Sequence, residues 1–147
     1  MGDIYRVTFA GSIWGTLVKA VLMLGGYLAN LSRFNLFNLL GSIFVGSIRA
    51  PWILVNAVGL GIDLILGIAA GLIYASVVKQ RSNVLWGVLY GLILWITAGL
   101  VIWAFSLGPT MWNMGNRTAA VTLVSFLAYG AVLGATLATA VKEKTRL

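Results

Sequence analysis

The chain has 147 residues, of which 61% are hydrophobic and 9% are charged, and its formal net charge is +7. A soluble domain is about half apolar and about a quarter charged, so this composition predicts an integral membrane protein. The absence of cysteine and histidine excludes thiolate metal sites, iron–sulfur clusters, histidine-bound haem or zinc and histidine-based triads. Its only acidic residues, Asp3, Asp63 and Glu143, leave little material for paired-carboxylate catalysis.

The positive charge does not indicate a nucleic-acid-binding protein. The basic residues lie beside the apolar stretches and not on one polar face, and no nucleic-acid-binding motif accompanies them. Lys and Arg next to membrane spans are explained by topology and by attraction to anionic lipid headgroups. We therefore expect membrane lipids as partners, and no nucleic acid, metal or cofactor.

Four apolar stretches are each long enough to cross a bilayer as a helix, which takes about 20 residues. They cover residues 7–30, 52–78, 84–107 and 118–141. The third stretch ends at Gly108-Pro109, because proline cannot donate a backbone hydrogen bond to a continuing helix. The pattern predicts an all-α integral membrane protein. We expect residues 1–147 to form one membrane domain, with four transmembrane helices in a bundle.

Basic residues set the expected direction of the spans. With four spans, both ends of the chain lie on the side that carries Arg6, Lys79, Arg81, Lys142, Lys144 and Arg146. The other side carries Arg33, Arg49 and Arg117. An excess of Lys and Arg marks the cytoplasmic side, so we expect both termini in the cytoplasm. All of these residues except Arg117 are expected to contact lipid headgroups.

The loop after the first span carries an amphipathic pattern. Over residues 34–49, polar or small side chains recur at three- and four-residue steps, at Asn35, Asn38, Ser42, Gly46 and Arg49. Apolar residues fill most of the other positions. The pattern predicts a helix that lies flat in the outer membrane interface or dips into the membrane as a re-entrant segment. The alternative is a helix that packs over the bundle.

A weak internal repeat relates the two halves of the chain. Residues 13–18 (IWGTLV) are similar to residues 85–90 (LWGVLY), and residues 71–79 are similar to residues 134–142. Both halves would be helical hairpins in the same orientation, which predicts a parallel repeat about an axis along the membrane normal. Chance similarity is the alternative, because apolar helices use a small alphabet of residues.

Each span also carries a pair of glycines four residues apart. The pairs are Gly11 and Gly15, Gly67 and Gly71, Gly87 and Gly91, and Gly130 and Gly134. Glycines at this spacing leave a flat strip on which two helix backbones can approach closely. Their presence in every span predicts tight packing, either within the bundle or between protomers.

Two charged residues interrupt the apolar spans. Lys19 and Asp63 each fall near the middle of a predicted helix, where a charged side chain costs about 2.5–3.5 kcal/mol on insertion scales. Their helices are consecutive and antiparallel, and such helices are usually neighbours. Both residues also lie on stripes of small and polar side chains, which turn away from lipid. We therefore expect Lys19 to pair with Asp63.

Three roles for this pair are open. In the structural role, the pair fixes the order and rotation of the helices, and losing one partner costs about 3–5 kcal/mol because the other stays unpaired. In the transport role, Asp63 is a proton or cation site and Lys19 is its internal competitor. In the third role, one of the two residues pairs with a lipid or with another subunit.

Several segments resemble a known family. They are APWIL at 50–54, GLIYASVVK at 71–79, LWGVLYGLILW at 85–95, LGP at 107–109 and LAYGAVLG at 127–134. They resemble the YqhR-like family of small four-helix membrane proteins of Bacillus-type Gram-positive bacteria. The resemblance covers residues 50–138, while the first span shares only its Gly-rich, Trp-containing character. It implies a bacterial cytoplasmic membrane and the four-span topology, and it carries over no catalytic residue.

The sequence thus favours a non-enzymatic membrane protein. We expect a packing or accessory protein that assembles through its glycine faces, as a homo-oligomer or as a subunit of a larger membrane complex. The alternative is a small transporter or a proton or cation conduit that uses Asp63 and Lys19. An enzyme would need a second polar cluster, and the candidates, Asn35, Asn38, Arg33 and Arg49, are typical of headgroup contacts.

Overall fold

The computed structural model describes residues 2–45, 50–78 and 83–145, and the side chains of residues 4–45, 50–78 and 83–141. Over these residues the chain forms five α-helices and no strand: α1 (Gly2–Leu28), α2 (Leu36–Val45), α3 (Trp52–Val78), α4 (Val84–Ala104) and α5 (Asn116–Thr145). Among the described helices, the four other than α2 are long and apolar enough to cross a membrane. This confirms the predicted all-α class and the four helices of membrane length.

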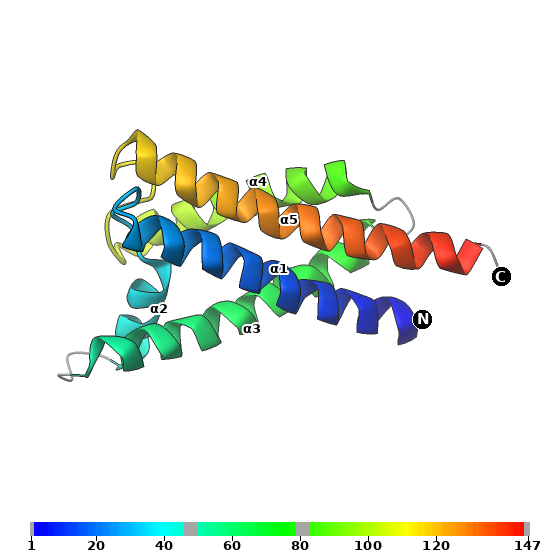
Figure 1. Ribbon diagram of the computed structural model, residues 1–147, viewed down its shortest axis with the longest axis horizontal. Helices are drawn as coiled ribbons and strands as arrows, with labels where there is room; N and C mark the ends of the chain where they lie inside the picture. Colours follow the sequence, from blue (N-terminus) through cyan, green and yellow to red (C-terminus); the bar gives the residue numbers. More distant parts are fainter. Residues whose placement is uncertain (1, 46–49, 79–82, 146–147) are drawn as a thin grey trace.

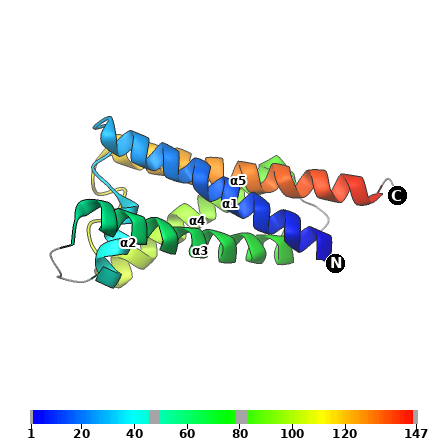
Figure 2. The ribbon, with the colours of Figure 1, turned by 60° about the horizontal axis from the view of Figure 1, so that its bottom comes forward.

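The four long helices run along the long axis of the molecule (Figure 1). Both termini lie at one end, here called the terminal end, while α2 and the connection from α4 to α5 lie at the other, the α2 end (Figures 1 and 2). Helix α5 packs against both α4 and α1, α1 packs also against α3, and α3 packs against α2. Although α3 and α4 are consecutive, they make few close backbone contacts.

A side-chain cap begins α4, and a change of backbone conformation ends it. The side chain of Asn83 accepts a hydrogen bond of 2.8 Å from the backbone N–H of Trp86, which is the geometry of a helix N-cap. The helix ends at Ala104, before the expected limit at residue 107. Ser106 adopts a left-handed backbone conformation, with φ at 50°, and this turns the chain before Gly108-Pro109 is reached.

The other helices differ from the expected spans mainly at their ends. Helix α1 begins before residue 7 and ends at Leu28, because Asn30 has a φ of 57° and terminates the helix in the left-handed region. Helix α5 extends beyond residues 118–141 at both ends. Helix α2 covers part of the expected range 34–49, of which positions 46–49 lie outside the described residues.

The buried apolar residues form two clusters. The cluster at the α2 end contains Ala20, Met23, Phe34, Leu36, Phe37, Ile102, Met111 and Phe126. The cluster at the terminal end contains Tyr74, Ala75, Tyr129, Leu133 and Leu137. Helices α3 and α5 span the length between the two ends, so Phe126 and Tyr129, one turn apart on α5, belong to different clusters. The charged residues of α1 and α3 lie at this junction.

Candidate functional site

Lys19 and Asp63 form an ion pair inside the protein. The Lys19 Nζ donates a hydrogen bond of 2.7 Å to Asp63 Oδ1, and the two side chains are 6% and 3% exposed. The pair joins α1 to α3, which pack against each other. A pair this deeply buried ties the rotation of one helix to the rotation of the other, because neither charge can be left without its partner at low cost.

Two aromatic rings of α5 complete the surroundings of Lys19. The Nζ atom lies 4.8 Å from the centroid of the Phe126 ring and 5.7 Å from that of the Tyr129 ring. Ring faces attract a cation at such distances. The Tyr129 hydroxyl donates a hydrogen bond of 2.6 Å to the backbone oxygen of Gly67 on α3, which fixes the ring. The lysine therefore connects three helices, and not only the two that the sequence pairs.

One oxygen of the Asp63 carboxylate has no partner. Among the described residues, the buried side-chain atoms without a hydrogen bond are Asp63 Oδ2 and Thr110 Oγ1. Most buried polar atoms in proteins are hydrogen-bonded, so an unpaired carboxylate oxygen requires an explanation. Asp63 and Lys19 both line a cavity of about 320 Å³, so the unpaired carboxylate oxygen belongs to a residue in the wall of that cavity.

The cavity lies between α3 and α4 and is lined almost entirely by apolar groups. Its walls consist of Leu36, Leu39, Leu40, Leu66, Gly67, Ala70, Leu94, Thr97, Ala98, Val101, Ile102, Leu107, Phe126 and Tyr129, together with the ion pair. Residues of all five helices contribute. Such a combination of an apolar lining and a few polar groups is typical of small-molecule sites in proteins, which have volumes of about 300–1,000 Å³.

Hydroxyl groups line the face of α1 between the ion pair and the terminal end. Thr8, Ser12 and Thr16 are fully buried, and each donates a hydrogen bond of 2.7–2.8 Å to the carbonyl oxygen one turn earlier in α1. They face α3, where a Cβ atom added to Gly67 or Gly71 would collide with the Thr16 or Ser12 hydroxyl. Since these hydroxyls already donate hydrogen bonds within α1, they need no hydrogen-bond partner on α3, and the two helices can pack closely.

The glycine pairs of α4 and α5 lie directly against one another. A Cβ atom on Gly87 would collide with the backbone oxygen of Gly130, and one on Gly134 would lie 3.0 Å from the Cα of Gly87. Gly91 faces the backbone of Phe126 in the same interface. The two backbones therefore touch along the glycine strips, as the spacing indicates.

The glycine pairs of α1 and α3 also face helices of the same chain. A Cβ atom on Gly11 would lie 3.0 Å from the Cβ of Thr136 on α5, and one on Gly15 would lie 2.9 Å from the ring of Tyr129. Gly67 and Gly71 face α1, as described above. The sequence left open whether the glycine strips pack within one chain or between chains. In the structure, each of the four strips packs against another helix of the same chain.

The basic residues expected at lipid headgroups are described in part. Arg6 near the terminal end and Arg33 near the α2 end are both exposed, as a headgroup contact requires. The backbone N–H of Arg33 also donates to the Thr118 hydroxyl at 3.0 Å, which attaches the loop after α1 to α5. The remaining positions lie outside the described side chains: Arg49, Lys79, Arg81, Lys142, Lys144 and Arg146.

The asparagines expected at the interface have a structural role. The Asn35 side chain accepts hydrogen bonds of 3.1 Å from the N–H groups of Phe37 and Asn38, which caps α2. It also donates to the side-chain oxygen of Asn56 on α3 at 2.9 Å. Asn38, in contrast, is exposed. Asn35 therefore both caps α2 and holds it against α3.

Polar tips of aromatic residues make contacts that the sequence analysis missed. The Tyr90 hydroxyl of α4 donates to the backbone oxygen of Ala70 on α3 at 2.6 Å, and Trp95 Nε1 donates to the Thr122 hydroxyl on α5 at 3.0 Å. The available signal was their position deep within a span, where the O–H of Tyr and the N–H of Trp need a partner.

The described residues contain no cluster of potential metal ligands. Of the three acidic residues of the chain, Asp63 is the one whose side chain the structure describes.

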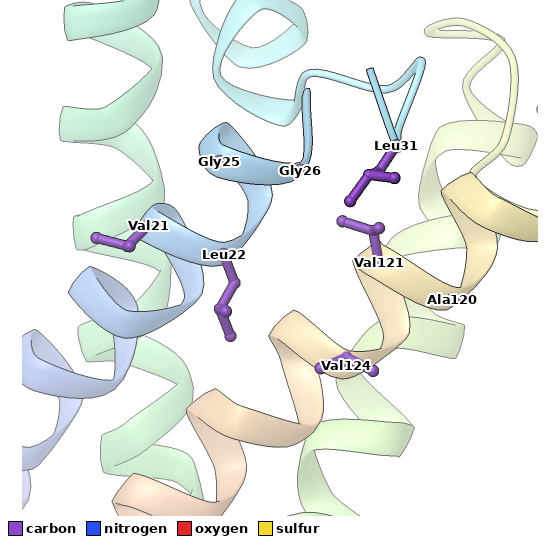
Figure 3. Close-up of a pocket in the computed structure, with 8 residues that line it drawn as sticks. All are labelled: Val21, Leu22, Gly25, Gly26, Leu31, Ala120, Val121 and Val124. Atoms are coloured by element: carbon purple, nitrogen blue, oxygen red, sulfur yellow. The ribbon is translucent and has the colours of Figure 1, made fainter. Parts of the chain in front are cut away.

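A second apolar groove lies between α1 and α5 near the α2 end. It has a volume of about 410 Å³ and is lined by Val21, Leu22, Gly25, Gly26, Leu31, Ala120, Val121 and Val124. Leu31 and Val121 point toward each other across it (Figure 3). A Cβ atom added to Gly25 would meet nothing within 4 Å, so this glycine presents bare backbone to the surroundings.

The helices and their apolar surfaces define a multi-pass, all-helical membrane protein. No protein-family model, curated protein or solved structure matches the chain. Its function is therefore argued from the geometry of the ion pair, the cavity and the groove.

Proposed function

We propose that this chain is a non-enzymatic accessory protein of a bacterial cytoplasmic membrane, which packs against a transmembrane helix of a partner chain. The groove between α1 and α5 is the observation that carries the proposal. Its lining is apolar, and Gly25 leaves an open strip of backbone. Small residues at such a surface allow a second helix to approach closely, and this contact is the main source of affinity between helices in lipid.

The ion pair has an architectural role in this proposal. Lys19 and Asp63 are buried, and the hydroxyls beside Lys19 on α1 donate to their own helix. The ion pair holds α1 and α3 in a fixed rotation. The groove formed by α1 and α5 is then presented to the partner as a rigid surface.

We also propose how the chain is placed in the membrane. The four long helices form a transmembrane bundle with both termini in the cytoplasm, and α2 lies in the outer interface. The exposed position of Arg33 and the polar contacts of Asn35 at the α2 end support this placement of α2. The resemblance to the YqhR-like family supports the same topology and a bacterial cytoplasmic membrane.

Site-specific photo-crosslinking tests the accessory role, and the cysteine-free chain makes it straightforward. Gly25→Cys and Ala120→Cys place a benzophenone-maleimide probe in the groove, whereas Ile73→Cys places it on an exposed part of α3. We expect the two groove variants to give one discrete adduct in native membranes, with the control variant giving none. An adduct of twice the chain mass would identify a second copy as the partner.

The absence of adducts from both groove variants would contradict the proposal. The same would hold if Ile73→Cys gave the same set of adducts, because the contact would then not be specific to the groove.

Transport is the second candidate function, and the unpaired Asp63 Oδ2 at the α3–α4 cavity favours it. Proton or cation flux into proteoliposomes would distinguish the two roles. If Asp63→Asn keeps the thermal stability and native mass of the wild type but abolishes a measurable flux, Asp63 is a transport site and the architectural role is wrong.

A further inference from the structure

The cavity between α3 and α4 has fixed ends. Near the α2 end, Leu36, Leu39 and Leu40 of α2 fill the space between the two long helices. Toward the terminal end, the hydrogen bond from Tyr90 to the carbonyl oxygen of Ala70, itself a lining residue, ties α4 to α3. The cavity is thus bounded by residues of α2 near one end and by the Tyr90–Ala70 hydrogen bond toward the other.

The cavity opens toward the lipid-facing surface of the protein. Leu66 on α3 is 53% exposed and Val101 on α4 is 44% exposed, and both line the cavity. Thr97 of α4 is exposed beside them, but its hydroxyl donates to the carbonyl oxygen of Ile93 within the same helix. A molecule entering between α3 and α4 would therefore meet an apolar mouth, which suits a molecule dissolved in the bilayer.

The ion pair supplies the polar end of the cavity. Asp63 Oδ2 is a buried acceptor without a donor. Lys19 donates to Oδ1, and its ammonium group carries further N–H donors beside the rings of Phe126 and Tyr129. The polar end thus offers one unused acceptor next to a donor, at the inner end of an apolar space.

This arrangement selects the chemistry of a ligand. A charged head, of either sign, would bring a third and uncompensated charge beside a pair that is already neutral, and burying an unpaired charge in an apolar cavity is costly. A hydroxyl group is neutral, donates one hydrogen bond and accepts others. It would donate to Asp63 Oδ2 and accept from Lys19 without disturbing the pair. A plain hydrocarbon would fill the cavity but leave Oδ2 unpaired.

We propose that the α3–α4 cavity binds a membrane-dissolved long-chain alcohol or another neutral lipid with a free hydroxyl, with the hydroxyl on Asp63 and the chain leaving between α3 and α4. The site does not depend on the accessory role, since it lies on a different face from the α1–α5 groove. It is a binding site, and no bond is made or broken in it.

A competition experiment with ligands that differ only in the head tests the proposal. The full chain is placed in phosphatidylcholine nanodiscs, whose lipids carry no free hydroxyl. A long-chain alcohol with a diazirine next to the hydroxyl is photo-activated, and the labelled residues are mapped by mass spectrometry. The competitors are 1-dodecanol, dodecane, dodecylamine and dodecanoate at equal mole fractions in the bilayer. We expect labelling of the lining segments around residues 63–70 and 94–102, with 1-dodecanol competing about tenfold better than dodecane.

Matched variants separate the cavity from the rest of the surface. Ala98→Leu fills the α3–α4 cavity without touching the ion pair, and Ala120→Leu makes the same change in the α1–α5 groove. We expect Ala98→Leu to abolish the labelling and Ala120→Leu to leave it unchanged, with native mass and thermal midpoint confirming that both variants fold.

Three results would overturn the proposal. In the first, dodecane competes as well as 1-dodecanol, so the hydroxyl is not recognised. In the second, the label spreads evenly over lipid-facing positions or persists in Ala98→Leu. In the third, a copurified chain is crosslinked to the cavity residues and 1-dodecanol fails to displace it, in which case a partner helix occupies the space.

Discussion

At the scale of single residues, Lys19 is a charged side chain that links three helices. Its ammonium group meets a carboxylate from α3 at 2.7 Å and two ring faces from α5, so it contacts both neighbours of its own helix. The ion pair joins α1 and α3, which are successive helices of membrane length and bring residues 19 and 63 to similar depths. The aromatic contacts come from a helix that is far away in the sequence.

Replacing one member of the ion pair should destabilise the protein more than replacing both. We expect Lys19→Met and Asp63→Asn each to lower the free energy of unfolding by about 3–5 kcal/mol, because one buried polar or charged group then lacks its partner. The double variant should recover most of this loss. Thermal midpoints and native masses of the four proteins measure the effect. If all three variants lost the same free energy of unfolding, the loss would come from the missing ion pair, and not from the charged or polar group that a single substitution leaves without a partner.

The cap of α2 allows a similar comparison between two asparagines. Asn35→Ala removes two hydrogen bonds to backbone N–H groups and the bond to Asn56. We expect a loss of about 1–2 kcal/mol. Asn38→Ala, three residues along the same helix and exposed, should change stability by less than about 0.5 kcal/mol. Urea or thermal unfolding in one detergent provides the measurement, and equal effects would contradict the assigned cap.

At the scale of helices, glycines decide which surfaces touch. The strips of α4 and α5 bring the two backbones into contact, while those of α1 and α3 receive side chains from a neighbouring helix. The sequence identified all eight of these glycines but not their partners. A spacing of four residues predicts which face of a helix is flat, but it does not predict which helix packs on that face. The pairing of α1 with α5 depends on helices that are not consecutive.

Two glycine-to-alanine substitutions should have opposite effects. Gly87→Ala would drive a Cβ atom into the backbone of Gly130, so α4 and α5 must separate, and we expect a loss of about 1–3 kcal/mol. Gly61→Ala on α3 meets nothing within 4 Å and improves helix propensity, so it should be neutral or stabilising by up to about 1 kcal/mol. Thermal midpoints measure both effects. A loss of similar size in Gly61→Ala would show that the collision of the added Cβ atom is not the cause of the loss in Gly87→Ala.

How far the helices could be predicted depends on the kind of signal. Helix α3 lies between Pro51 and a polar connection, so composition alone locates it. The end of α4 could not be predicted, because the left-handed conformation of Ser106 depends on how the connection at the α2 end packs. The cavity beside Asp63 could not be predicted either, since residues of all five helices line it and their arrangement is not visible in the sequence. The charged residues and the apolar pattern of the sequence predict the Lys19–Asp63 ion pair, but they do not predict the cavity beside it.

At the scale of the whole molecule, the two ends differ in what they present. The terminal end carries the chain termini, and the α2 end carries a short helix and the connection from α4 to α5 (Figure 2). With four helices of membrane length among the described residues, both termini should lie on the same side. Because the larger group of basic residues lies at this end of the sequence pattern, we propose that this side faces the cytoplasm.

Accessibility of single cysteines in intact cells should reveal this orientation. We expect a membrane-impermeant maleimide to label Asn113→Cys, in the exposed connection at the α2 end, without permeabilisation. Tyr5→Cys, exposed near the terminal end, should be labelled only after the membrane is opened. The opposite pattern would invert the topology and place α2 on the cytoplasmic side.

The distance along the chain between the two charges has a consequence for biosynthesis. Lys19 precedes Asp63 by 44 residues, so Lys19 leaves the ribosome about 2–9 s before its counter-charge does. The hydroxyls of α1 are satisfied by α1 itself, but its lysine is not. Throughout that interval a helix with an unneutralised ammonium group must wait in or beside the insertion machinery. Delivery of α1 to the bilayer is thereby coupled to the synthesis of α3, and a nascent chain that stops before Asp63 should let α1 slip back out.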